Sequence, residues 1–291
     1  MIYSFLYVII YSCASVFIEK LYFSIPPLFS LMITATVATL YFNIVNIGKL
    51  KTVYVACWRE RKLWFSIMIS ILIIWSCTMV APGMIGASFF NFLCFSWLGM
   101  VGFLSSGIID WKKNRAHFVF FFCILILIIV SIFDYLIHSF TRPHIWGILM
   151  GIVAGNISFL YFKQSQAIVK RIQLSATQIL AVRFYLTIFA LFIFLPKNSF
   201  SLYFSFLNII QLFLLACASL ILPLYFMQKA LEKITSEQSA IIISLSPAAT
   251  AFLQQIIFQN IELKFIIIYL LYSIIIAISY GYKKYTLRGI K

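Results

Sequence analysis

Charged residues are scarce in this sequence. Asp, Glu, Lys and Arg together make up 10% of the chain, whereas hydrophobic residues make up 64%. A soluble domain carries roughly 25% charged residues, because it needs polar groups to cover its surface. The shortage therefore excludes a soluble protein and predicts an all-α integral membrane protein.

Acidic residues are the scarcest of the charged types, with 7 Asp and Glu against 22 Lys and Arg. Each acid falls in a connection or at the end of an apolar run. The seven are Glu19, Glu60, Asp110, Asp134, Glu232, Glu237 and Glu262. Carriers coupled to protons or sodium ions usually need a carboxylate near the middle of the membrane, so its absence favours facilitated diffusion or exchange. Glu19 comes nearest, and a salt bridge or an interfacial position explains it at least as well as coupling.

Sequence motifs typical of enzymes and of metal sites are also absent. The sequence holds no HExxH, no CxxC, no paired aspartates and no nucleophile elbow, and its 6 cysteines lack metal-ligand spacing. A membrane-embedded enzyme needs His, Asp, Glu or Cys clustered at a common depth. We therefore expect no enzymatic activity, no cofactor and no bound metal.

The sequence consists mainly of long apolar runs. Ten are found, and most have about the ~20 residues that cross the hydrocarbon core as a helix. They lie near residues 1–18, 26–46, 63–82, 84–109, 116–137, 144–163, 175–195, 205–228, 236–258 and 263–282. The connections between them are short, so we expect no separate soluble domain.

The first run is predicted to be a retained helix rather than a secretory signal. It lacks a basic stretch at its start, and its core carries Tyr3, Tyr7 and Tyr11. Glu19 and Lys20 stand where a small-residue cleavage site would be needed. All ten runs thus count as expected spans.

Basic residues are distributed unevenly over the connections. Of the 22 Lys and Arg, 17 lie at one alternate set of helix ends, four lie at the other, and Arg183 lies inside a run. The larger set comprises Lys49, Lys51, Arg59, Arg61, Lys62, Lys112, Lys113, Arg115, Lys163, Lys170, Arg171, Lys229, Lys233, Lys283, Lys284, Arg288 and Lys291, and the smaller one Lys20, Arg142, Lys197 and Lys264. The positive-inside rule then places both termini in the cytoplasm and the chain in the cytoplasmic (inner) membrane. Topology explains the net charge of +15, and because the basic residues form no contiguous patch, we expect no nucleic-acid partner.

Ten spans with both ends on one side suggest two halves, residues 1–138 and 139–291. Five spans per half is an odd number, so the second half must insert upside down, as an inverted repeat of the transporter type. PPLFSLMIT, Pro26–Thr34, opens the second run, and SATQILAVR, Ser175–Arg183, opens the seventh. Thr34 and Arg183 then occupy equivalent positions.

Two local sequences are similar to those of a known family. ALEKITSEQSAIIISLSPAATAFL, Ala230–Leu253, looks like its signature of a helix end, a polar turn, a small-residue run and a proline, and QILAVRF, Gln178–Phe184, looks like its arginine near the start of the seventh helix. The chain thus resembles the drug/metabolite transporter superfamily, in particular its ten-helix EamA-like branch. It departs from the family pattern in the fourth run, where Phe95 to Trp97 replace an expected proline. The resemblance implies alternating access and a central cavity lined by helices one, three, four, six, eight and nine.

Polar and aromatic side chains on those helices are the candidates for substrate binding. They are Tyr11, Trp75, Asn91, Trp97, Asn156, Tyr161, Tyr225, Gln228 and Gln254. Neutral hydrogen-bonding groups and aromatic faces suit a small neutral or zwitterionic solute. Each aromatic has the alternative of facing lipid or an interface, and each amide that of pairing with a neighbouring helix.

Arg183 completes the candidates and has two interpretations. An ionisable residue inside the membrane favours a function, since a guanidinium could hold a substrate carboxylate or phosphate bidentately. Alternatively, it snorkels or ties together carbonyls of kinked helices, and the resemblance does not place the seventh helix at the cavity. The sequence favours the structural clamp.

Three further patterns predict helix geometry. The glycines at 147, 151 and 155 form a GxxxG stripe for close helix approach, and Asn156 beside it is expected to face a cavity. Thr235 and Gln238 form a capping box that starts the ninth helix after a short turn. Pro223 and Pro247 are expected to kink the eighth and ninth helices.

The sequence thus predicts a carrier that moves a small organic metabolite through the lipid bilayer. Amino-acid-like solutes are the first expectation, and nucleoside-derived or cofactor-like solutes the second. A lipid flippase is the nearest rival, and a pore or a structural role is the third interpretation. The oligomeric state is not predicted.

Overall fold

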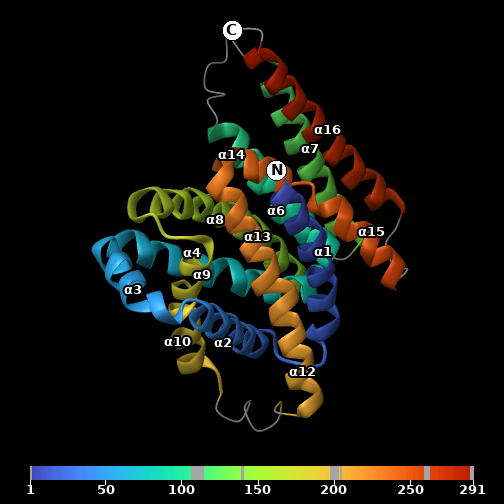
Figure 1. Ribbon diagram of the computed structural model, residues 1–291. Helices are drawn as coiled ribbons and strands as arrows, with labels where there is room; N and C mark the ends of the chain where they lie inside the picture. Colours follow the sequence, from blue (N-terminus) through green and yellow to red (C-terminus); the bar gives the residue numbers. More distant parts are fainter. Residues whose placement is uncertain are drawn as a thin grey trace.

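The computed structural model describes residues 2–105, 115–138, 141–196, 203, 205–258 and 263–288, and all regular elements in these ranges are helices (Figure 1). The helices are α1 (Ile2–Tyr22), α2 (Pro27–Val45), η1 (Ile47–Lys49), α3 (Leu50–Arg59), α4 (Arg61–Val80), α5 (Pro82–Ile85), α6 (Ala87–Ser105), α7 (Arg115–His138), α8 (Arg142–Ile172), α9 (Ala176–Val182), α10 (Tyr185–Phe194), α12 (Phe206–Leu215), η2 (Ala216–Ile221), α13 (Leu222–Lys233), α14 (Ser236–Ile243), α15 (Ser246–Phe258) and α16 (Leu263–Arg288). η1 is a 3-10 helix and η2 is a π-helix. The composition predicted this all-α architecture.

Eight helical stretches of the described chain are long and apolar enough to cross a membrane. They are Ile2–Tyr22, Pro27–Val45, Arg61–Ile85, Val119–His138, Arg142–Ile172, Ala176–Phe194, Phe206–Lys233 and Ser236–Phe258. Each overlaps one predicted span, which confirms a multi-pass membrane protein. The predicted spans 84–109 and 263–282 overlap two shorter apolar helices, Ala87–Gly102 and Phe265–Ile276.

Some residues used in the sequence argument lie outside the described residues. They are Asp110, Lys112, Lys113, Lys197, Glu262 and Lys291, together with residues 106–109 of the fourth predicted span and the side chains of Arg115, Lys264, Lys283, Lys284 and Arg288. The count of basic residues on each face therefore stays a prediction from the sequence.

α8 is longer than the predicted run 144–163, because it continues as one helix to Ile172. The added residues include Lys and Gln, which are good helix formers, so a loss of hydropathy does not end the helix. They also pack: Ser70 of α4 donates to the side-chain oxygen of Gln164 at 3.1 Å, and Gln164 donates to Ser66 at 2.6 Å. The extension thus joins α8 to α4.

A short helix, α3, occupies a segment that the sequence argument treated as a loop. It is amphipathic, with Val53 and Cys57 fully buried and Trp58 60% exposed. Burial raises the pKa of the Cys57 thiol to about 11. The Tyr54 hydroxyl shares a short hydrogen bond with that of Tyr185 on α10, which fixes α3 against the membrane helices.

Three candidate spans are interrupted. The first break is at Ala81, before Pro82; the second is at Arg183 and Phe184, between α9 and α10; the third is at Ser244 and Leu245, before Pro247. Pro223 follows the π-helical turn in the eighth span. The irregularities expected near Pro223 and Pro247 are therefore present, whereas the break at Arg183 was not predicted.

The capping box at the start of α14 is confirmed. Gln238 donates from its backbone N–H to the Thr235 hydroxyl at 3.2 Å, and Thr235 donates from its backbone N–H to the Gln238 side chain at 3.3 Å. Only Ile234 and Thr235 separate α13 from α14. The turn is as short as the sequence predicted.

The glycine stripe on α8 lies against α5 and α6. A Cβ at Gly147 would lie 2.6 Å from Ile85, and one at Gly151 would lie 3.0 Å from Leu93. At Gly155 a Cβ would lie 2.4 Å from the backbone oxygen of Cys94. The predicted close approach is therefore confirmed, and α6 is the principal partner.

Helices that are distant in the sequence pack together. α4 contacts α8 and α1 contacts α13, while α6 contacts both α14 and α15. α2 contacts α9 and α10, and α7 lies along α16, as Figure 1 shows for the green and red helices. Two clusters of buried apolar side chains result. One includes residues of α1, α2, α4, α9 and α13, the other includes residues of α7, α15 and α16, and α6 and α8 contribute to both.

Candidate functional site

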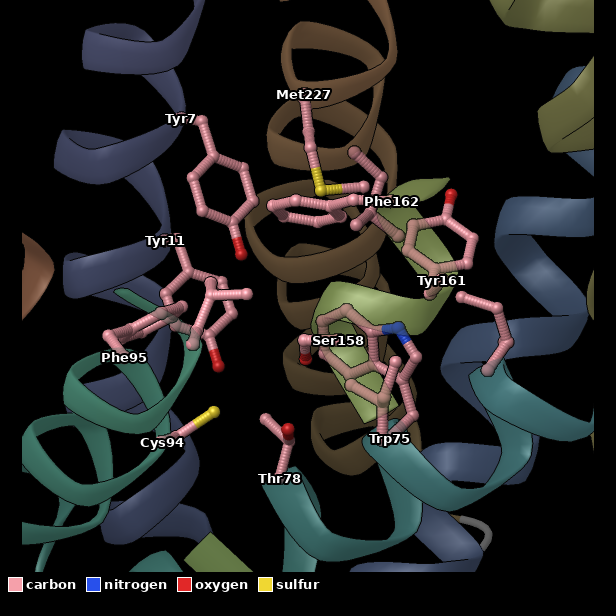
Figure 2. Close-up of a pocket in the computed structure, with 14 residues that line it drawn as sticks. Tyr7, Tyr11, Trp75, Thr78, Cys94, Phe95, Ser158, Tyr161, Phe162 and Met227 are labelled. Atoms are coloured by element: carbon pink, nitrogen blue, oxygen red, sulfur yellow. The ribbon is translucent and has the colours of Figure 1, made fainter. Parts of the chain in front are cut away.

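A cavity lies where α1, α4, α6, α8 and α13 meet, and Figure 2 shows its lining. The lining residues are Tyr7, Tyr11, Ile71, Ile74, Trp75, Thr78, Cys94, Phe95, Leu98, Ser158, Tyr161, Phe162, Leu224 and Met227. None of these described residues is charged. The polar groups are hydroxyls, one thiol and one indole, so the walls are apolar with a few neutral hydrogen-bonding groups.

Tyr11 is at the centre of the aromatic part of the cavity. Its ring stacks on Tyr7 with centroids 5.2 Å apart, and it meets Phe95 edge-on at 5.4 Å and Trp75 at 6.4 Å. In Figure 2 the hydroxyl of Tyr7 points into the space between α1, α8 and α13. Such ring faces attract a ligand cation as well as apolar groups.

The cavity is narrow in this conformation. The space open to the centres of water molecules measures about 30 Å³, which is room for about two waters. Sites for organic ligands usually have about 300–1,000 Å³. The lining side chains must therefore move apart before an organic solute fits.

Three of the ten predicted site residues, Tyr11, Trp75 and Tyr161, line the cavity. Trp97 and Tyr225 do not: Trp97 packs its Cβ against the glycine stripe at Gly155, and Tyr225 contacts the ring of Phe226 at 5.7 Å. Both are only partly buried.

Asn156 lies on the exposed side of α8, contrary to the expectation that it faces a cavity. Its amide nitrogen donates to the Ile152 carbonyl of its own helix at 3.0 Å. It directly follows Gly155, which is buried against α6, so a step of about 100° around the helix turns Asn156 outward. Asn156 therefore lies on a different face of α8 from the glycine stripe and from the residues that line the cavity.

Asn91 is fully buried and joins three helices instead of lining the cavity. Its amide nitrogen donates to the hydroxyls of Ser15 on α1 and Thr250 on α15, both at 2.9 Å, while its oxygen has no partner among the described residues. This is the interhelical pairing that the sequence left open as the alternative.

A second polar contact lies between α1, α6 and α15. Glu19 accepts from the backbone N–H of Ala87 at 2.8 Å, at the start of α6, and Gln254 donates to Glu19 at 3.3 Å. Gln254 also accepts from the backbone N–H of Ser88 at 2.9 Å. Gln254 thus binds protein groups, and Glu19 stabilises the positive N-terminal end of α6.

Gln228 is fully buried beside the cavity, one residue after the lining residue Met227. Its oxygen accepts from Ser165 of α8 at 2.8 Å, and its amide nitrogen has no partner among the described residues. The contact joins α13 to α8.

Arg183 is fully buried at the break between α9 and α10. Its Nη1 donates to the Tyr161 hydroxyl at 2.6 Å, and its guanidinium carbon lies 4.8 Å from the ring centre of Phe184. Within the described chain, Nε and Nη2 make no hydrogen bond and no carboxylate forms an ion pair with it. Arg183 does not line the cavity, but its partner Tyr161 does.

Sequence reasoning missed most of the lining, although a helical repeat would have found part of it. Tyr7 lies four residues before Tyr11, Ile71 four before Trp75, and Ser158 three before Tyr161. Residues at these spacings share one face of a helix. Extending each predicted residue by one turn would therefore have identified three more lining residues.

A larger hollow lies at the surface between α3 and α4, near the start of α4. It is lined by Trp58, Arg59, Glu60, Arg61, Lys62, Leu63, Ser66 and Arg171. Arg171 bonds Glu60 at 3.0 Å, and both side chains are substantially exposed. The hollow is an open, charged surface at the ends of two candidate spans, so the aromatic cavity between the helices is the better candidate for a solute site. Among the described residues no three His, Cys, Asp or Glu side chains are grouped as metal ligands.

No model of a known protein family matches the chain, and no curated protein matches it either. The function is therefore argued from the fold and the cavity.

Proposed function

We propose that the protein is a secondary carrier that moves a small organic metabolite, amino-acid-like in the first instance, across the cytoplasmic membrane by alternating access. The observation that carries the proposal is the aromatic cavity enclosed by α1, α4, α6, α8 and α13. These helices belong to the first, third, fourth, sixth and eighth predicted spans. The resemblance to the drug/metabolite transporter superfamily implied a cavity at these spans together with the ninth.

The pattern of helix contacts supports two inverted halves, residues 1–138 and 139–291. Numbered by predicted span, the second packs on the seventh, the fourth on the ninth and the fifth on the tenth. The first packs on the eighth, and the third on the sixth. An inverted repeat has a two-fold axis that exchanges each span with the one five places later. This exchange converts the 1–8 pair into the 6–3 pair and leaves the other three pairs unchanged.

The interrupted helices support a change between two conformations. Breaks at Arg183 and at Ser244, with the π-helical turn before Pro223, lie in the seventh, ninth and eighth predicted spans. Discontinuous helices are the usual places where transporters bend around a central site. The small volume of the cavity fits a closed state of such a cycle.

The chemistry of the lining supports the class of solute. Aromatic faces from Tyr7, Tyr11, Trp75 and Phe95 suit an ammonium group or an apolar side chain. The hydroxyls of Thr78 and Ser158 can orient a polar group. A flat heterocycle would stack on the same rings, so nucleoside-derived solutes remain the second candidate.

Counterflow in proteoliposomes tests the proposal. Purified protein is reconstituted with labelled amino acids, nucleosides and cofactor-like metabolites, with and without a pH gradient. We expect saturable exchange of one class, independent of the pH gradient because none of the described residues that line the cavity is a carboxylate. Empty liposomes are the control for leakage.

Two outcomes would contradict the carrier. Uptake that rises linearly with solute concentration, without counterflow, would indicate a pore. If no solute of the panel is exchanged and labelled phospholipids cross between the leaflets of the same vesicles, the protein is a lipid flippase.

A further inference from the structure

Arg183 is a buried charge with too few partners. A guanidinium carries five N–H donors, and in the described chain only Nη1 has an acceptor, the Tyr161 hydroxyl. The rings of Phe184 and Tyr161 lie 4.8 Å and 5.8 Å from its central carbon and provide cation–π contact. Burying a charge without an anion is costly, so the site is electrostatically incomplete.

A structural clamp requires Arg183 to donate hydrogen bonds to backbone carbonyls of the interrupted helices. The break at Arg183 frees backbone carbonyls of α9, and other side chains bind them: Trp64 donates to the Val182 oxygen at 3.0 Å, and Asn43 donates to the Ala181 oxygen at 3.4 Å. Among the described residues, Arg183 donates to no backbone carbonyl. Trp64 and Asn43 therefore bind the carbonyls that a structural clamp would have Arg183 bind.

The two unpartnered nitrogens have a geometry suited to an oxyanion. Nε and Nη2 lie on one edge of the guanidinium and present two nearly parallel N–H bonds, the fork that carboxylates and phosphates bind with two oxygens. Arg183 is also next to the cavity. Its partner Tyr161 forms part of the wall.

We infer that the transported solute carries a carboxylate or phosphate group that binds the Nε–Nη2 fork of Arg183, while Tyr161 holds the guanidinium in place through Nη1. This inference rests on the carrier function proposed above and narrows its substrates to anions and zwitterions. The aromatic faces around Tyr11 take the apolar or cationic part of the same solute. Uncharged nucleosides are then poor substrates, whereas nucleotides carry the phosphate that the site requires.

Thermal unfolding of the purified full chain in detergent tests binding without transport. The probes are matched pairs: each amino acid against its carboxamide, and a nucleotide and inorganic phosphate against the uncharged nucleoside. We expect the carboxylate or phosphate member to raise the melting temperature and the neutral member to have no effect. Equal shifts for both members of every pair would overturn the inference.

Variants at Arg183 assign the effect to its side chain. Arg183→Gln should lower the affinity for the anionic probe about ten- to hundredfold, the range of charge-assisted hydrogen bonds, and Arg183→Lys should retain part of it. Arg171→Gln is the matched control, because Arg171 is exposed and bonded to Glu60. If Arg183→Gln binds the anion as tightly as the unaltered protein, the inference is wrong.

Tyr161→Phe keeps the test valid if the Arg183 variants fail to fold. The change removes the acceptor of Nη1 and leaves the charge and the Nε–Nη2 fork in place. The guanidinium then has fewer partners of its own, so the anionic probe should bind more tightly. A structural arginine predicts the opposite pattern, with lower stability and no change in the response to anions.

Counterflow with the same pairs separates the two proposals. Exchange that does not distinguish an amino acid from its carboxamide would support the carrier function and contradict the anion site. Binding of anions that depends on Arg183, without any counterflow, would support the anion site and contradict the carrier function.

Discussion

Tyr11 makes ring contacts with three other residues of the cavity wall, Tyr7, Trp75 and Phe95. Each aromatic pair contributes about 0.5–1.5 kcal/mol beyond its buried area. We therefore expect Tyr11→Ala to weaken solute exchange by at least about tenfold in the half-saturating concentration. Counterflow of the solute identified in the panel is the measurement.

The control for this prediction is Tyr225→Ala, because Tyr225 is aromatic and partly buried but lies outside the cavity wall. It should leave the half-saturating concentration within about twofold, as is usual for a change away from the site. Equal losses in the two variants would show that the wall around Tyr11 has no special role.

Gly155 carries a second prediction at the scale of a residue. Its added Cβ would lie 2.4 Å from a backbone oxygen and 2.8 Å from Trp97, and a backbone group cannot rotate away. Gly155→Ala should destabilise the fold by about 1–3 kcal/mol, the usual cost of overpacking. Thermal unfolding in detergent measures it, with Gly48→Ala as the control because nothing lies within 4 Å of a Cβ there.

At the scale of the element, the α9–α10 break depends on donors from neighbouring helices. Trp64→Phe removes the indole N–H that binds the Val182 carbonyl and leaves a partly buried acceptor unpaired. The expected loss of stability is about 1–3 kcal/mol, measured as a lower midpoint of thermal unfolding. Trp58→Phe is the matched control, since Trp58 is 60% exposed; comparable losses in the two would contradict the role of the indole.

α3 provides a pH-dependent test. The pKa of the Cys57 thiol is raised to about 11 by burial, and only the thiolate reacts with maleimides. Cys57 should therefore react slowly at neutral pH and faster as the pH rises toward 11. A cysteine at exposed position 58 of the same helix should react readily at neutral pH; equal rates at the two positions would show that α3 is not docked.

The sequence predicted elements well where hydropathy or a local motif determines them. Eight spans, the capping box of Thr235 and the close packing at Gly155 follow from composition or from neighbours in the chain. The helical state of α3 was missed because a short amphipathic helix between spans has too few apolar residues to register as a run. The break at Arg183 was missed because its carbonyls are satisfied by Trp64 and Asn43, which are more than a hundred residues away.

At the scale of the whole molecule, the orientation predicted from the basic residues can be tested by labelling. In a chain with all 6 cysteines replaced, a cysteine at Ser24, in the turn between α1 and α2, should react with a membrane-impermeant maleimide added to intact cells. A cysteine at Lys233, the last residue of α13, should react only after permeabilisation. The reverse pattern would invert the topology.

The packing of α1 has a consequence for the order in which the protein is made. α1 leaves the ribosome before α13 and α15, which are among its partners, and Ser12 donates to the backbone of Ser246 at 3.4 Å, 234 residues later in the chain. α8, by contrast, meets α4 and α6 already inserted. α1 therefore enters the membrane long before α13 and α15 reach it, and until then the Ser12 hydroxyl faces lipid or the insertion machinery.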